Sequence, residues 1–194
     1  LPSKHSDGHN FLALAEKMGA KYAVVNKTTS FSSTKLHLIP VKNTLQALQD
    51  IARLYRTNMK TKVISITGSY GKTLVKDLLY QFLSVKNNTA TSPESFNSQI
   101  GVPLSLLNIT NNDKFAVIEA GISHPGEMDS LATMIQPDYA ILTNIGNAHL
   151  TTLQKMSTTA KEKAKLLKNV PKNGWELLPK NKQRSPLLQE IKAQ

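Results

Sequence analysis

A glycine-containing turn between a strand-like and a helix-like segment is the feature that most constrains this chain. The apolar run 63–67 predicts a buried strand, and residues 72–86 have the spacing of an amphipathic helix. The turn between them reads Gly68-Ser69-Tyr70-Gly71-Lys72-Thr73. Glycines let successive backbone N–H groups face one anion, and a helix N-terminus adds partial positive charge, so the turn predicts a phosphate-binding loop. Ile66 stands where the general G-x-x-x-x-G-K-[ST] pattern has its first glycine, so a chance helix start is the alternative.

Strands and helices alternate along the rest of the chain. We expect further strands at 22–25, 35–39 (ended by Pro40), 115–119 and 139–143, and further helices at 10–18, 43–56, 125–135 and 157–169. Asn43 is a good N-cap for the second of these helices. The polar stretch 56–62 has the composition of a linker or a domain boundary. The alternation predicts an α/β fold with a parallel sheet, in which ligands bind beyond the carboxyl ends of the strands.

The charge of the chain allows a polyanion-binding alternative. The 24 Lys and Arg outnumber the 13 Asp and Glu, for a net charge of +11, which would ordinarily suggest nucleic acid as a partner. Ten of the basic residues and only three acidic ones lie in 155–194, away from the motifs, so we expect no specific nucleic-acid partner. The chain has no Cys, no run long enough for a membrane span and no signal-like opening, which favours a cytoplasmic protein.

Four segments in order resemble the Mur ligases, the ATP-dependent amide-forming enzymes of peptidoglycan synthesis. The segments are TGSYGKT (67–73), TSPESFNSQIGVPL (91–104), IEAGISHPGE (118–127) and TNIGNAHL (143–150). Residues 7–11 and the helix from Thr44 resemble the end of the family's first, uridine-nucleotide-recognising domain. The resemblance implies a partial N-terminal domain at 1–60, a partial central ATP-binding P-loop domain at 61–170, and an unassigned basic tail at 171–194.

Two short strings indicate the branch of the family. HPGE (124–127) and DGH (7–9) resemble the ligases that join D-Ala-D-Ala to UDP-MurNAc-tripeptide through an acyl phosphate. SFNSQIG (95–101) resembles the ligase half of chains fused to an alanine racemase. These substrates, with ATP and Mg²⁺ as cofactors and a monomeric state, are what the resemblance implies. Because nothing after Lys168 resembles the rest of the family, we expect an incomplete enzyme.

Lysine, carboxylate and histidine side chains carry the expected chemistry. Lys72 would clamp the phosphates, and Thr73, Glu119 and His149 would hold Mg²⁺, a cation that prefers oxygen ligands. Glu119 could instead cap the turn after its strand, and His149 could be an ordinary loop residue. Asn144 would help to bind nucleotide, or it satisfies backbone groups at the strand end.

A lysine and a polar segment complete the expected site. The family uses a carbamylated lysine at the position of Lys163, although Lys161 and Lys165 compete for this assignment and such alternation also suits a solvated helix face. Thr91, Asn97, Ser98 and Gln99 resemble the segment that holds the UDP-MurNAc-peptide. The remaining alternatives are a nucleotide-binding fragment without ligase activity, and a sibling ligase such as the folate polyglutamate enzymes.

Overall fold

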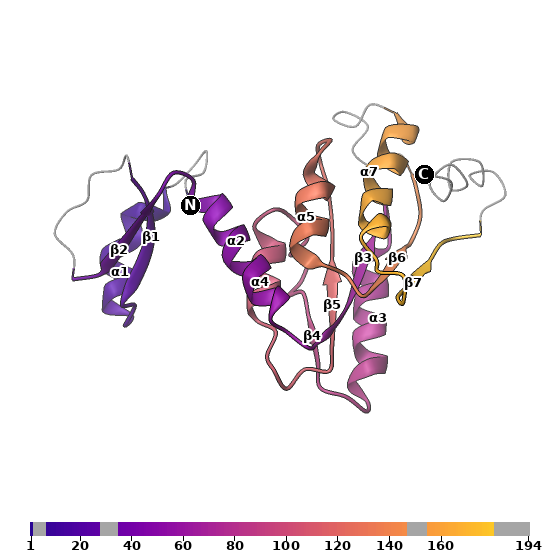
Figure 1. Ribbon diagram of the computed structural model, residues 1–194, viewed down its shortest axis with the longest axis horizontal. Helices are drawn as coiled ribbons and strands as arrows, with labels where there is room; N and C mark the ends of the chain where they lie inside the picture. Colours follow the sequence, from indigo (N-terminus) through magenta and orange to yellow (C-terminus); the bar gives the residue numbers. More distant parts are fainter. Residues whose placement is uncertain (2–6, 28–34, 147–154, 181–194) are drawn as a thin grey trace. The chain divides into compact units, whose positions relative to one another are not determined.

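The computed structural model describes residues 1, 7–27, 35–146 and 155–180, which fall into two compact units (Figure 1). The first unit is Leu1–Ile51 and the second is Ala52–Gln194. Unit 1 contains the 3₁₀-helix η1 (Gly8–Phe11), α1 (Leu12–Lys17), β1 (Tyr22–Asn26) and β2 (His37–Val41). Helix α2 (Thr44–Thr57) begins in unit 1 and ends in unit 2.

Unit 1 is built around a parallel pair of strands. Tyr22 pairs with His37 and Asn26 with Val41. Pro40 lies inside β2 rather than ending it, because a strand of a two-stranded sheet can leave one side unpaired and so tolerates a missing N–H. Phe11 and Leu14 of this unit are each 53% exposed.

The predicted N-cap of α2 is confirmed. Asn43 Oδ1 accepts hydrogen bonds from the backbone N–H groups of Leu45 (2.9 Å) and Gln46 (3.0 Å). These bonds pair two of the donors that a helix start leaves without intrahelical partners.

Unit 2 is a five-stranded parallel sheet in the order β4-β5-β3-β6-β7. Its strands are β3 (Lys62–Thr67), β4 (Thr89–Thr91), β5 (Phe115–Glu119), β6 (Tyr139–Leu142) and β7 (Trp175–Leu177), and its helices are α3 (Lys72–Ser84), α4 (Gly101–Leu107), α5 (Glu127–Ile135) and α7 (Met156–Lys168). The predicted α/β fold with a parallel sheet is therefore confirmed. β4 and β7 were not predicted, since three residues are too short to show a period.

Side chains from both faces of the central strand are buried, which explains its continuous apolar run. Ile64 and Ile66 of β3 pack with the α3 residues Val75, Leu79 and Leu83. Val63, on the other face, belongs to a larger core with residues of α4 and α5, and residues of α7 pack on β6 (Figure 1). Two helical layers thus hold the sheet in place and leave its carboxyl end free to carry loops.

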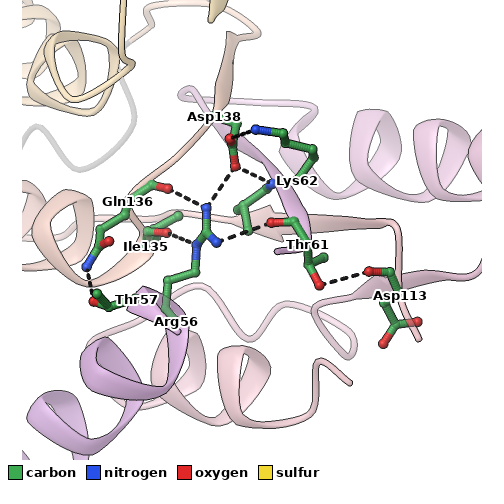
Figure 2. A network of polar contacts seen from close by, with 9 residues as sticks. Arg56, Thr57, Thr61, Lys62, Asp113, Ile135, Gln136 and Asp138 are labelled. Atoms are coloured by element: carbon green, nitrogen blue, oxygen red, sulfur yellow. Dashed lines mark hydrogen bonds and ion pairs between the residues drawn. The ribbon is translucent and has the colours of Figure 1, made fainter. Parts of the chain in front are cut away.

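A buried arginine fixes the opposite, amino end of the sheet (Figure 2). Arg56 Nε donates to the carbonyl oxygen of Ile135 at 2.9 Å, and its Nη2 reaches Asp138 Oδ2 at 2.8 Å. Asp138 also accepts from Lys62 Nζ and from the backbone N–H of Val63. The interpretation of 56–62 as a linker is therefore wrong at its first residue, which is buried and joins α2 to the starts of β3 and β6. Among the described residues, no helix combines the length and apolar character needed to cross a membrane.

Candidate active site

The predicted phosphate loop lies between the carboxyl end of β3 and the start of α3. Gly71 is the N-cap of α3 with a φ of 74°, and Gly68 has a φ of 151°. Both values fall where L residues with a Cβ are strained. A Cβ on Gly68 would also collide with Thr143 Oγ1, so glycine is required there for close approach as well as for conformation.

The turn after β6 cradles this loop. Asn144 Oδ1 accepts from the backbone N–H of Tyr70 at 3.0 Å, and the Asn144 carbonyl accepts from the N–H of Ser69 at 3.0 Å. Thr143 Oγ1 donates to the Tyr70 carbonyl at 2.6 Å, and Ser69 Oγ accepts from the Gly146 N–H at 2.8 Å. Asn144 thus contacts the backbone of the loop, and its side chain holds the loop through Tyr70.

Glu119 lies at the end of the neighbouring strand β5, buried and joined to the loop. Thr73 Oγ1 donates to Glu119 Oε2 at 2.8 Å, and Asn97 Nδ2 donates to Oε1 at 2.6 Å. Ser95 Oγ lies 3.5 Å from Thr73 Oγ1. The structure therefore brings Thr73, Asn97 and Glu119 together, three residues that the sequence analysis singled out from separate segments.

Lys163 reaches the same loop from α7. Its side chain is 2% exposed, and Nζ donates to the Gly68 carbonyl at 3.0 Å. Burial, together with the positive charge of Lys72, lowers the pKa of Lys163 to about 8. The competing lysines lie elsewhere: Lys161 is exposed, and Lys165 pairs with Asp129 and Glu162.

The other expected substrate-binding residues make contacts within the protein. Thr91 Oγ1 donates to the Val117 carbonyl, and Gln99 Nε2 donates to the Glu127 carbonyl. Ser98 Oγ accepts from the N–H of Gly101 at the start of α4. His149, the third expected Mg²⁺ ligand, lies outside the described residues.

The sequence analysis missed Lys76, which is buried in α3 close to this site. Lys76 precedes Leu79 and Tyr80 by three and four residues, and both of these residues pack against the core. This helical spacing could have indicated that Lys76 lies on the buried face of α3.

The residues present fit a magnesium–nucleotide ligand. Within the part of the chain that the structure describes, Thr67 Oγ1 is the one buried side-chain nitrogen or oxygen without a hydrogen-bond partner, and it immediately precedes the loop. A buried hydroxyl left unpaired is costly, and its position suits an added polar group. The hydroxyl of Thr73 and the carboxylate of Glu119 are hard oxygen donors of the kind that Mg²⁺ takes. No cluster of three His, Cys, Asp or Glu occurs among the described residues.

Comparisons with known proteins point to one family. Residues 66–194 match the family model of the Mur ligase middle domain, including the segment 171–194 that the sequence analysis left unassigned. The UDP-N-acetylmuramoyl-tripeptide–D-alanyl-D-alanine ligase of Bacillus subtilis is 33% identical over 174 residues, which cover 90% of this chain and 38% of the relative. The ligase of that name from Escherichia coli is 32% identical, with 92% of this chain and 39% of the relative covered.

Two solved structures have a similar fold and cover the whole length of this chain. MurF of Acinetobacter baumannii superposes with a TM-score of 0.88 at 29% identity, covering 100% of this chain and 42% of the other. MurF of Thermotoga maritima, solved in complex with ADP, gives a TM-score of 0.87 at 28% identity, with 100% and 44% covered. The chain thus spans about two fifths of the length of these relatives. With a matching family model over most of its residues, the chain belongs to the Mur ligase family.

Proposed function

We propose that this chain is part of an ATP-dependent amide ligase of peptidoglycan precursor synthesis. It would join D-Ala-D-Ala to UDP-MurNAc-tripeptide in two steps. The carboxylate of the tripeptide would take the γ-phosphoryl group of ATP, with release of ADP, and the amine of D-Ala-D-Ala would then attack the resulting acyl phosphate and displace phosphate. The observation that carries the proposal is the convergence of the phosphate loop, Glu119 and Lys163 at one edge of the sheet. The names of the relatives supply the substrates.

The loop and Lys72 would bind and polarise the phosphates. Lys72 is the first residue of α3, so its ammonium group and the helix N-terminus act on the same anion. Charge is dense on a transferring phosphoryl group, and positioning with electrostatic stabilisation supplies most of the catalysis in such reactions. We therefore assign Lys72 a catalytic role.

Thr73 and Glu119, with His149, would hold Mg²⁺, which would neutralise charge on the phosphates. Asn97 keeps the Glu119 carboxylate oriented through its 2.6 Å hydrogen bond. Lys163 would act as a carbamate, because a buried lysine with a lowered pKa has a substantial neutral fraction, and only a neutral amine adds to CO₂. Carbamylation would replace a cation beside Lys72 with an anion, which suits a cation site.

The remaining expectations belong to the same proposal. Residues 91–99 would hold the UDP-MurNAc-peptide, with Thr91, Asn97, Ser98 and Gln99 as its candidate contacts. Residues 1–60 would be the end of the uridine-nucleotide domain, and 61–170 part of the ATP-binding domain. We place the protein in the cytoplasm as a monomer, in accord with the family.

Lys72→Met tests the assignment of ATP chemistry. We expect the affinity for ATP, measured by calorimetry with Mg²⁺, to fall at least about 100-fold, because one charge clamp on the phosphates is lost. Lys86→Met, at an exposed position beyond the end of the same helix, should change the affinity less than twofold. Equal ATP affinities in the Lys72→Met variant and the unchanged chain would contradict the proposal.

The ligase reaction itself separates the alternatives. Phosphate release that requires both UDP-MurNAc-tripeptide and D-Ala-D-Ala would support the proposed ligase. ATP binding without such release from this chain, beside an active full-length relative, would indicate a nucleotide-binding fragment. Release that depends instead on folate and glutamate would indicate the sibling enzymes.

A further inference from the structure

Lys76 is a buried cation whose ammonium group has three oxygen partners. Its side chain lies in α3 and the residue is 1% exposed. Nζ donates to the carbonyl oxygens of Ser92 at 3.0 Å and Glu94 at 2.5 Å, and lies 3.2 Å from Asp77 Oδ1. Of the three N–H donors of this ammonium group, two therefore donate to backbone carbonyls, and Asp77 is its ion-pair partner. A charge is retained in such a buried position only when it is paired in this way.

The two carbonyl groups belong to a turn with unusual backbone geometry. Glu94 has a φ of 43°, in the left-handed region that residues with a Cβ rarely occupy. Such a conformation persists only where the surroundings hold it. The hydrogen bond from Lys76 Nζ to the Glu94 carbonyl helps to hold Glu94 in this conformation. Ser92, the other partner, accepts the backbone N–H of Glu119 through its Oγ at 3.1 Å.

The turn carries side chains into the candidate active site. Ser95 lies against Thr73, and Asn97 donates to Glu119. The carbonyl of Asn97 accepts the N–H of Gly121 at 2.8 Å, and a Cβ on Gly121 would come within 2.8 Å of the Asn97 side chain. Asn97 is therefore fixed from one side by the end of β5, and its turn is fixed from the other side by Lys76.

We propose that Lys76 is a positioning residue of this site, which holds the turn 92–97 so that Asn97 orients Glu119 and is set to contact the peptide substrate. The substrate part of this inference rests on the proposed function. Lys76 acts through the turn, because its contacts are the backbone carbonyls of Ser92 and Glu94 and the carboxylate of Asp77. A neutral side chain of the same length would leave the Ser92 and Glu94 carbonyls without their donor, and Glu94 would be free to leave the left-handed region.

The variant Lys76→Met, with Asp77→Asn as its control, tests the proposal. Asp77→Asn changes the exposed partner of Lys76 but keeps both carbonyl bonds. In Lys76→Met we expect the affinity for UDP-MurNAc-tripeptide to fall at least tenfold. The affinity for ADP without Mg²⁺, which the loop backbone binds, should change less than twofold. Asp77→Asn should leave both affinities within twofold.

Two further measurements separate positioning from general support of the fold. In ¹⁵N spectra of the ligand-free chain, the side-chain amide hydrogens of Asn97 should be protected from exchange with solvent. Lys76→Met should remove that protection. Adding Glu94→Gly to Lys76→Met should restore substrate affinity to within about threefold, because glycine adopts a positive φ without being held.

Each outcome decides a separate point. Failure of the unchanged chain to bind UDP-MurNAc-tripeptide overturns the proposed function. The role of Lys76 is then still tested by comparing the Asn97 side-chain amide signals of the unchanged chain and of Lys76→Met. Unchanged Asn97 signals in Lys76→Met, or an equal loss of ADP and peptide affinity, overturn the positioning role. If Lys76→Met does not fold, Lys76→Leu, which likewise has no N–H donor, takes its place. Unfolding of both variants also overturns the role, because the whole fold would then require this lysine.

Discussion

Three lysines near the loop differ in what surrounds each amino group. Lys72 begins α3 at the loop, Lys76 is buried with three oxygen partners, and Lys163 is buried with the Gly68 carbonyl as its hydrogen-bond acceptor. Because Lys163 is buried and lies near the charge of Lys72, its pKa falls to about 8. Burial and neighbouring charges thus give three identical side chains different properties.

The lowered pKa of Lys163 predicts reactivity with CO₂. At pH 8 about half of its amine is neutral, whereas an ordinary lysine with a pKa of about 10.4 is well under 1% neutral. We expect a carbamate signal in ¹³C spectra with labelled bicarbonate, growing as the pH rises through about 8. Lys163→Arg should remove the signal, and Lys165→Met should keep it. A signal that survives Lys163→Arg would assign the carbamate to another lysine.

At the scale of elements, the starts of two strands and the end of α2 share one polar network. Burial alone would raise the pKa of Asp138, but hydrogen bonds from Lys62 and the Val63 N–H, together with the charge of Arg56, outweigh it and lower the pKa. The carboxylate therefore stabilises the folded state at every pH above its ordinary value of 3.8. This stabilisation is lost as the pH falls through the lowered pKa.

Asp138→Asn should be costly at neutral pH and much less so in acid. We expect the free energy of unfolding in urea to fall by about 2 kcal/mol at pH 7, because Arg56 loses a charged partner. The difference from the unchanged chain should shrink as the pH falls below 3.8 towards the lowered pKa of Asp138, because the folded unchanged chain then also has a neutral Asp138. Lys62→Met, which removes a half-exposed ion pair, should cost less than about 1 kcal/mol. A cost for Asp138→Asn that is the same at pH 3 and pH 7 would contradict this account.

At the scale of the whole molecule, the two units differ in how they bury apolar side chains. β3 is buried on both faces between helical layers, whereas Tyr22, Val24 and Ile39 of the two-stranded sheet in unit 1 are exposed. A two-stranded sheet is marginally stable by itself, while the core strands of a larger sheet open only with global unfolding.

Native-state hydrogen exchange should therefore separate the units. We expect backbone amides of β1 and β2 to exchange at least about 100-fold faster than those of β3 and β5. The protection of α2 should rise towards its C-terminal end, where Ala52 and Arg56 are buried. Equal protection of β1 and β3 would show instead that the chain unfolds as one cooperative body.

The sequence was sufficient where the signal is local. The strand, glycine turn and helix around Gly68 were predicted because their residues are neighbours in the chain, and the cap at Asn43 depends on contacts within three residues. β7 was missed because a three-residue strand has no detectable period, and Arg56 was placed in a linker because its partner Asp138 lies 82 residues away.

The sequence by itself determined the order of strand, loop and helix, and with it the candidate phosphate loop and the family. Only the tertiary structure decided which side chains complete the site. Parallel strands joined by crossover helices bring distant residues to one edge: Thr73 and Glu119 meet across 46 positions, and Lys163 meets Gly68 across 95. Burial at that edge, which no local pattern encodes, distinguishes Lys163 from its neighbours and makes Lys76 an internal ion.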